Sequence, residues 1–244
     1  MRPRSVDWAA LQDHDEQDSG EGLRERKKRL LRQQLSDTAT EMFLERGFDA
    51  VKVVEVAAAC DVSEKTVYNY FPTKESLILD RWEGTMAAIR TALADTGVSP
   101  VDAVLRILAD ELGALAAWLA TQPDLAGATS SVRRFGELIA TTPALRAYQT
   151  GTLTELTAVA AETLAGRYGL SPDDPESQIA AIALLGLWHI HFRALGKYLD
   201  GTATPAQVEQ AVSREVERAG KLIAAGLRTL GSEARGRSAA TAPA

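Results

Sequence analysis

Apolar residues recur with helical spacing through most of the chain. Between residues 24 and 46 they form one stripe with a period near 3.6, which predicts an amphipathic helix with one buried face. The residues of that stripe are Leu31, Leu35, Ala39, Met42 and Phe43. Gly47 follows the last apolar position, and we expect it to end this helix in a left-handed conformation.

Two short helices and a long one are expected next. The pattern predicts a helix over residues 53–59 and a second over 63–70, with Ser63 as its N-cap. Pro72 cannot continue a helix, and Thr73 is placed to cap a long helix of about 74–95. These elements make a compact N-terminal unit.

Prolines punctuate the rest of the chain near the expected helix starts, where a missing N–H leaves no hydrogen bond unmade. We expect helices at about 100–120, 123–140, 143–168, 175–199 and 205–230. The sequence has no β-hairpin signal and no Gly-rich phosphate loop. It therefore predicts an all-α protein with a small N-terminal unit over 23–76 and a larger C-terminal helical bundle over 77–230.

Both ends of the chain are polar. Residues 1–22 are acidic and interrupted by glycine, and we expect a flexible arm there. Residues 231–244 have little apolar content, and we expect a disordered tail.

The composition limits the class of protein. The chain has 244 residues, formal net charge −6 and one cysteine, Cys60. A single cysteine excludes an internal disulfide and a Cys-rich zinc site, and it fits the reducing cytoplasm. We expect neither a signal peptide nor a membrane span, since no run approaches 18 apolar residues without a charge.

The net charge conceals a basic segment. Residues 24–32, "RERKKRLLR", carry six cations and one anion, Glu25. Such a run alone is usually a solvated helix face. Here it leads directly into the two short helices, and this position makes it a candidate contact to phosphates.

Residues 53–71 predict a helix–turn–helix. Val53, Val56 and Ala57 give the first short helix an apolar face, and Asp61 occupies the turn, where a positive φ is favoured. In the second short helix, Val67 and Phe71 are spaced to lie on its buried side.

The other side of that second helix is polar, which suits a helix that enters the major groove of DNA. Lys65 can reach guanine or a phosphate, Thr66 a phosphate or a thymine methyl, and Asn69 can read adenine. Tyr68 offers a flat ring and a hydroxyl. The full set of candidate DNA-binding residues is Lys52, Ser63, Glu64, Lys65, Thr66, Tyr68, Asn69, Tyr70 and Lys74. A plain surface helix is the alternative interpretation.

The segments "ATEMFLERGFDAV" (39–51) and "VAAACDVSEKTVYNYFPTKESL" (56–77) resemble the tetracycline-repressor-like (TetR) family of transcriptional regulators. The matching pattern is T-x-Y-x-Y-F-x-x-K-E-x-L, and the resemblance covers roughly residues 24–80. It implies a three-helix DNA-binding domain, a C-terminal domain for effector binding and dimerisation, and a twofold dimer on a palindromic operator. Repression is the family's usual mode.

Two positions depart from the family's pattern. Lys52 stands where the family commonly has a threonine that caps the second helix and touches a phosphate. Lys52 cannot act as that cap, but it can supply a cation to the phosphate. Asp61 replaces the usual turn glycine, and it places a carboxylate near DNA.

By the same resemblance, the helices of about 177–199 and 206–230 form the homodimer interface. An intramolecular bundle core is the alternative for their apolar positions, which include Val208, Val212 and Val216. For an unknown small-molecule effector, hydrophobic or amphipathic, the candidate contacts are Trp118, Arg134, Phe135, Tyr148, Trp188, His189 and Phe192.

No catalytic constellation is visible in the sequence, so we expect no enzyme, no cofactor and no metal. His189 and His191 lie about 200° apart around a helix and cannot chelate one ion. Two other hypotheses remain beside an effector-controlled repressor in the cytoplasm. One is a DNA-binding regulator without an inducer, and the other is a module that binds a partner protein.

Overall fold

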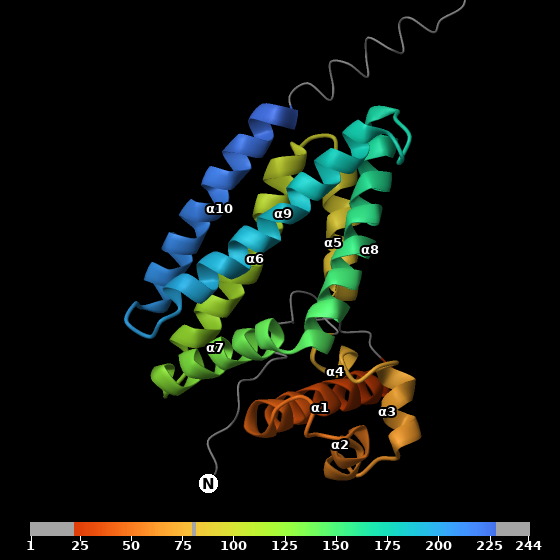
Figure 1. The fold of residues 1–244 in the computed structure, drawn as a ribbon, viewed down its shortest axis with the longest axis vertical. Coiled ribbons are helices and arrows are strands. Elements are labelled where there is room, and N and C mark those ends of the chain that lie inside the picture. Colours follow the sequence, from red (N-terminus) through yellow and green to blue (C-terminus); the bar gives the residue numbers. More distant parts are fainter. Residues whose placement is uncertain (1–21, 80–81, 228–244) are drawn as a thin grey trace, which may run out of the picture. The chain divides into compact units, whose positions relative to one another are not determined.

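A computed structural model describes residues 22–79 and 82–227 of the chain (Figure 1). Every regular element in these residues is an α-helix, which confirms the all-α prediction. The helices are α1 Leu23–Arg46, α2 Val53–Ala59, α3 Glu64–Tyr70, α4 Ser76–Leu79, α5 Trp82–Ala94, α6 Pro100–Ala120, α7 Leu125–Thr141, α8 Pro143–Tyr168, α9 Pro175–Tyr198 and α10 Pro205–Leu227.

The observed helices start and end within about two residues of the predicted ones, with one difference. The single helix expected over about 74–95 is described as α4 and α5, and residues 80–81 between them lie outside the described residues. The predicted acidic arm, the predicted tail and the last three residues of the expected final helix also lie outside them.

Gly47 ends α1, but not in the expected left-handed helical conformation. Its φ is 85° and its ψ is 151°, a region of backbone space that is open essentially to glycine alone. Its N–H donates to the carbonyl oxygen of Phe43. The glycine is thus needed, although the cap geometry differs from the predicted one.

The described residues form two compact units. The first comprises the described part of Met1–Arg81 together with Trp118–Gln149. The sequence placed the helical segment 118–149 in the C-terminal bundle, whereas here it groups with the helix–turn–helix. Leu145 of α8 is buried in the same core as the apolar side chains of α1 to α4. Phe135 and Tyr148 pack against this core.

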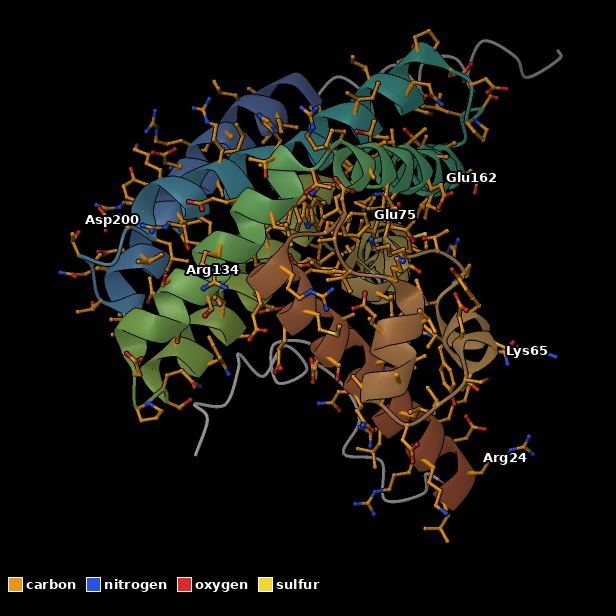
Figure 2. All side chains as sticks on the ribbon, turned by 60° about the horizontal axis from the view of Figure 1, so that its bottom comes forward. Arg24, Lys65, Glu75, Arg134, Glu162 and Asp200 are labelled. Carbon is orange, nitrogen blue, oxygen red and sulfur yellow. The ribbon has the colours of Figure 1, made fainter. Side chains whose placement is uncertain are left out.

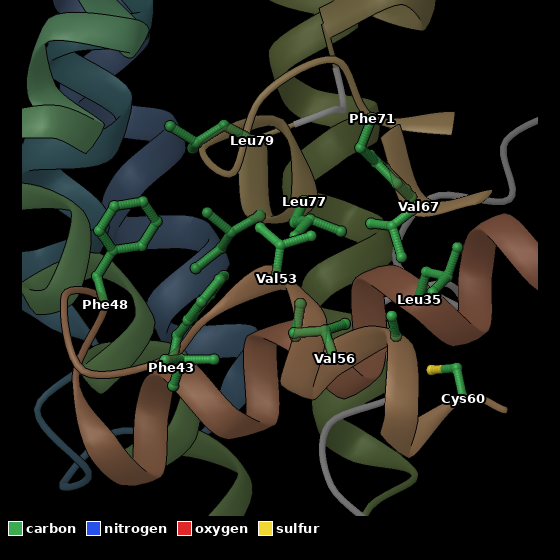
Figure 3. Close-up of a cluster of buried hydrophobic side chains, with 14 of the residues drawn as sticks. Leu35, Phe43, Phe48, Val53, Val56, Cys60, Val67, Phe71, Leu77 and Leu79 are labelled. Carbon is green, nitrogen blue, oxygen red and sulfur yellow. The ribbon is translucent and has the colours of Figure 1, made fainter. Parts of the chain in front are cut away.

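That core confirms the predicted apolar stripe of α1. Leu35, Ala39 and Phe43 are fully or almost fully buried, and Leu31 and Met42 pack at the edge of the cluster. Figure 3 shows Leu35 and Phe43 gathered with Val56, Val67 and Phe71 from α2, α3 and the end of α3. Burial of these side chains fixes how α2 and α3 lie against α1.

The second unit comprises Trp82–Ala117 and the described part of Thr150–Ala244. Here α9 and α10 pack along each other, with Trp188 and Leu184 of α9 buried. Gly220 of α10 is also buried, and a Cβ at this position would lie 3.1 Å from Leu105 of α6. The missing side chain lets α10 approach α6 closely.

Within one chain, Val208, Val212 and Val216 of α10 are already buried. Packing within one chain therefore accounts for the apolar character of these three positions, as the intramolecular alternative predicts. The face of α9 that stays exposed carries Ile179, Ile182 and Phe192.

Among the described residues, α9 is the one helix whose length and apolar composition would suffice to cross a membrane. Of its most apolar 18-residue window, 44% is buried inside the protein. A core helix of a protein can meet the same criteria of length and apolar composition.

Candidate nucleic-acid interface

The turn between α2 and α3 has the geometry expected of a helix–turn–helix. Asp61 has a φ of 55°, the one positive φ of a non-glycine residue among the described positions, which confirms the prediction for this residue. The N–H of Val62 donates to the carbonyl oxygen of Ala57 at 3.0 Å, and this bond closes the turn. Val62 itself packs at the edge of the core.

Ser63 caps α3 as predicted. Its Oγ accepts the N–H of Thr66 at 3.1 Å and lies 2.8 Å from the hydroxyl of Thr66. The cap satisfies one of the free N–H groups at the start of the helix. Because Thr66 is held in this way and is half-buried, it has less freedom than its neighbours to meet DNA.

The two sides of α3 differ as the sequence predicted. Val67 and Phe71 are buried, whereas Tyr68 is 46% exposed. Ser63, Glu64, Lys65 and Asn69 are also exposed. In Figure 2 the side chain of Lys65 points away from the protein. The helix thus presents a polar strip with one aromatic ring, on an element whose other side is anchored in the core.

Tyr70 lies at the margin of this strip. It is half-buried and packs against the core cluster. Its carbonyl oxygen accepts a hydrogen bond from Arg32 Nη1 at 3.3 Å, and the guanidinium of Arg32 lies 5.1 Å from the centre of the Phe71 ring. The last arginine of the basic segment is thereby joined to the end of α3.

The rest of the basic segment is exposed on the first turns of α1. Arg24, Arg26, Lys27 and Lys28 all face solvent. Arg24 is labelled at the free end of α1 in Figure 2. These cations are available to a polyanion.

Lys52 precedes α2 and its side chain is exposed. Its side chain makes no cap hydrogen bond, and the N–H of Lys52 donates to Oε2 of Glu55 at 2.8 Å. This bond, together with the hydrogen bond from Arg46 Nη2 at 2.8 Å, lowers the pKa of Glu55 below its ordinary value. The ammonium of Lys52 is left to face solvent.

Lys74 has partners inside the protein that the sequence did not reveal. Its Nζ donates to the carbonyl oxygen of Phe48 at 2.6 Å and lies 4.3 Å from the centre of the Phe48 ring. Burial lowers the pKa of Lys74, and the negative charges of nearby carboxylates such as Asp49 oppose this shift in part. Its predicted contact with a phosphate stays a prediction, and the structure adds a role in holding the loop after α1.

The seven candidate effector contacts are divided between the two units. In the first unit, Phe135 and Tyr148 pack against the helix–turn–helix core, and Arg134 Nη2 donates to the carbonyl oxygen of Leu44 at 3.1 Å. Trp118 and Trp188 are buried, whereas His189 and Phe192 are exposed on α9. Their contact with an effector stays a prediction.

Sequence reasoning missed His191. It is 3% exposed and lines a cavity in the second unit, between α6 and α10. The i, i+2 spacing of the two histidines showed that they face opposite sides of α9, but it did not show which of them faces inward. Among the described residues, no group of three or more His, Cys, Asp or Glu side chains is arranged to hold a metal ion.

A capped, exposed polar helix that is fixed across a tight turn defines the helix–turn–helix class of DNA-binding proteins. Two family models match the chain and together cover more than half of it. They are "Bacterial regulatory proteins, tetR family" over residues 35–80 and "MftR C-terminal domain" over residues 120–213. The chain belongs to the TetR family and is a DNA-binding transcriptional regulator.

Curated relatives include the HTH-type transcriptional regulator TcmR of Streptomyces glaucescens, 29% identical over 159 residues, which are 64% of this chain and 68% of TcmR. The HTH-type transcriptional repressor DhaR of Mycobacterium sp. (strain GP1) is 32% identical over 75 residues, 29% of this chain and 38% of DhaR. Among solved structures, Thermus thermophilus FadR in complex with lauroyl-CoA is 22% identical, with a TM-score of 0.43 over 79% of this chain and 92% of FadR.

Proposed function

We propose that the protein is a repressor that binds a palindromic operator as a homodimer and is released by a small hydrophobic or amphipathic effector. The observation that carries the proposal is the two-sided character of α3. Val67 and Phe71 anchor it in the core, and Lys65, Tyr68 and Asn69 stay exposed. Repression is favoured over activation because the relative DhaR is a transcriptional repressor.

Sequence reading is assigned to three exposed side chains of α3. Lys65 donates to guanine O6 and N7, and the amide of Asn69 pairs with adenine. The Tyr68 ring packs against a thymine methyl while its hydroxyl bonds to a base or a phosphate. Glu64 is placed to accept from cytosine N4, and it disfavours other bases by its charge.

Phosphate contacts are assigned to the exposed cations around α3. Lys52 lies at the start of α2, and Arg24, Arg26 and Lys27 lie on the first turns of α1. Ser63 and Thr66 are tied up with each other at the start of α3, so we assign them to backbone contacts rather than to base reading. Such contacts position the protein and make its affinity depend on salt.

Dimerisation is assigned to the exposed face of α9 and to the end of α10. Ile179 is 62% exposed, Ile182 55% and Phe192 45%, and Leu222 of α10 is 78% exposed. A cluster of large apolar side chains on a helix face is typical of a protein interface. A twofold dimer presents two α3 helices about 34–36 Å apart, and it therefore requires a palindromic operator.

The proposal assigns the protein to the cytoplasm, where it reaches DNA, and assigns it no catalytic step. A regulator that binds its operator but has no inducer is the second candidate. It would bind DNA with the same residues, but no metabolite would release it. A protein-interaction module would show no sequence-specific affinity for DNA.

The test begins with selection of the operator from a random duplex library with the wild-type protein. Tyr68→Ala should then weaken binding to the selected operator by about 1–3 kcal/mol, and Tyr68→Phe should retain whatever part the ring supplies. Fluorescence anisotropy with labelled operator and labelled random duplex measures both.

Random duplex is the control, because loss of base reading leaves non-specific binding unchanged. A failure of the selection to converge, or an equal loss on both duplexes, would remove α3 from sequence reading and with it this proposal.

A further inference from the structure

The second unit holds a cavity of about 310 Å³ that none of the residues singled out for an effector lines. Its lining comes from successive turns of α6, from α10 and from His191 of α9. The lining residues are Asp102, Leu105, Arg106, Leu108, Ala109, Leu112, His191, Ser213, Val216 and Glu217.

His191 is the polar group buried in this wall. Its Nδ1 is inaccessible and has no hydrogen-bond partner among the described residues. Burial lowers the pKa of His191 to about 4, so its imidazole is neutral at pH 7. A buried polar group without a partner is costly. Because this Nδ1 has almost no accessible surface, a ligand in the cavity reaches it only when the imidazole turns toward the cavity.

The charges at the cavity disfavour an anionic ligand. Among the lining residues, Asp102 and Glu217 are exposed carboxylates and Arg106 is the one cation. A carboxylate or phosphate ligand would meet two carboxylates against one guanidinium. The neutral imidazole adds no positive charge to attract it.

The size and the apolar lining point to a small ring compound. The lining includes the apolar residues Leu105, Leu108, Leu112 and Val216. The cavity is partly open to solvent, since Asp102, Arg106, Ala109 and Glu217 of its lining are exposed. An enclosed cavity of about 150 Å³ holds benzene, so about 310 Å³ has room for a molecule of one or two rings. A hydroxyl both donates and accepts, and it can therefore satisfy the imidazole in either tautomer.

We infer that this cavity is the effector site, and that it takes an uncharged one- or two-ring compound whose hydroxyl hydrogen-bonds to His191. The regulatory role of the site rests on the proposed function, whereas ligand binding does not. The site differs from the seven residues predicted from sequence, and the two assignments are separated by mutation.

The probe is 2-naphthol, compared with naphthalene and with 2-naphthoate. Isothermal titration of the full chain at pH 7, without DNA, measures each affinity. We expect 2-naphthol to bind about tenfold more tightly than naphthalene, which lacks the hydroxyl, and more tightly still than the anionic 2-naphthoate. No heat of binding for 2-naphthol, or 2-naphthoate binding as tightly, would overturn the inference.

Three variants locate the site. His191→Leu removes the hydrogen-bonding group and should weaken 2-naphthol binding about tenfold, and His191→Gln should recover part of that loss. Ala109→Phe places a large ring in the lining of the cavity without altering His191, so the inference stays testable if His191→Leu does not fold. Circular dichroism verifies folding. Wild-type affinity in both Ala109→Phe and His191→Gln would place the ligand elsewhere and overturn the inference.

Addition of 2-naphthol to the complex with selected operator distinguishes this inference from the proposed function. Release of the operator by 2-naphthol in wild type, but not in Ala109→Phe, supports both. Operator binding that 2-naphthol does not change, in a protein that binds 2-naphthol, overturns the assignment as effector site and leaves operator recognition standing. A protein that binds 2-naphthol but no operator contradicts the proposed function alone.

Discussion

Among single residues, Asp61 holds the least favourable backbone conformation of the helix–turn–helix. A left-handed conformation is about 1–2 kcal/mol unfavourable for most L-residues and free of that penalty for glycine. Since φ of Asp61 is 55°, Asp61→Gly should raise the free energy of unfolding by about 0.5–1 kcal/mol, after the greater freedom of the unfolded glycine chain is subtracted. Urea denaturation at fixed protein concentration measures the change.

Asp61→Ala is the matched control, because alanine has a Cβ but no side chain that stabilises the turn. It should lower stability by about 1 kcal/mol. Equal stability of Asp61→Gly and Asp61→Ala would show that the turn does not constrain this position in solution. Asp61→Asn keeps the turn preference without the charge, and so reports separately on repulsion from DNA.

His191 makes stability depend on pH in a defined direction. Its pKa is about 4 in the folded protein and 6.5 ordinarily, so the unfolded chain binds a proton that the folded chain does not. The contribution of the neutral imidazole is complete above pH 6.5 and is lost as the pH falls toward 4, up to about 3 kcal/mol. Urea denaturation of wild type and His191→Gln at pH 7 and pH 4 measures it.

The difference between the two proteins isolates this histidine from the carboxylates that titrate in the same range. We expect wild type to lose more stability than His191→Gln on acidification. A difference that is the same at both pH values would mean that His191 is already accessible to protons in the folded state.

Residue types and spacing predicted the polar face of α3 because that face follows from periodicity. The exposed Lys65 and Tyr68 and the buried Val67 and Phe71 are consequences of 3.6 residues per turn. Residue types and spacing could not predict the hydrogen bond of Lys74, because its partner is the backbone carbonyl of Phe48, 26 positions away. A carbonyl leaves no signature in the identity of its residue.

At the scale of elements, Arg167 joins the end of α8 to the end of α5 and the segment that follows it. Its guanidinium donates to the carbonyl oxygens of Leu93 at 3.1 Å, Asp95 at 2.8 Å and Val98 at 2.7 Å. Arg167→Ala would remove the shared donor of these three carbonyls, two of which accept in part-buried hydrogen bonds. We expect a loss of about 2 kcal/mol in the free energy of unfolding, measured by urea denaturation.

Two substitutions bound that prediction. Arg167→Lys keeps the charge but not the fork, and should recover less than half of the loss. Arg214→Ala is the surface control, since Arg214 donates to a carbonyl of its own helix, that of Gln210, at 3.3 Å. Similar small effects of Arg167→Ala and Arg214→Ala would remove the structural role of Arg167.

The helices themselves were predictable because their ends carry local signals. Pro100, Pro143, Pro175 and Pro205 begin four of them, as their fixed φ and missing N–H predict. The grouping of elements was less predictable. The sequence of α7 does not predict that Phe135 packs on the helix–turn–helix core. That contact depends on which apolar surfaces are still exposed once each helix has formed.

At the scale of the whole molecule, the proposed dimer requires a surface that a single chain leaves exposed. In the described residues, Ile179, Ile182 and Phe192 of α9 are exposed, and a substitution there should separate the protomers of the proposed dimer without unfolding them. Ile182→Glu places a charge on that face, where it would be buried in a twofold interface at both symmetric sites. We expect sedimentation equilibrium to show a dimer for wild type and a monomer for Ile182→Glu, with unchanged circular dichroism.

The affinity of Ile182→Glu for DNA is a second and stronger test of the same prediction. A monomer retains α3 and its cations, so binding to random duplex should persist, whereas affinity for the full palindrome should fall to that for a half-site. Leu125→Glu, a charge at an exposed leucine of α7, should keep both dimer and operator affinity. Two carboxylates buried at a twofold interface would repel each other and separate the protomers. If Ile182→Glu nevertheless stays dimeric and binds the palindrome as wild type does, this face of α9 is not the dimer interface.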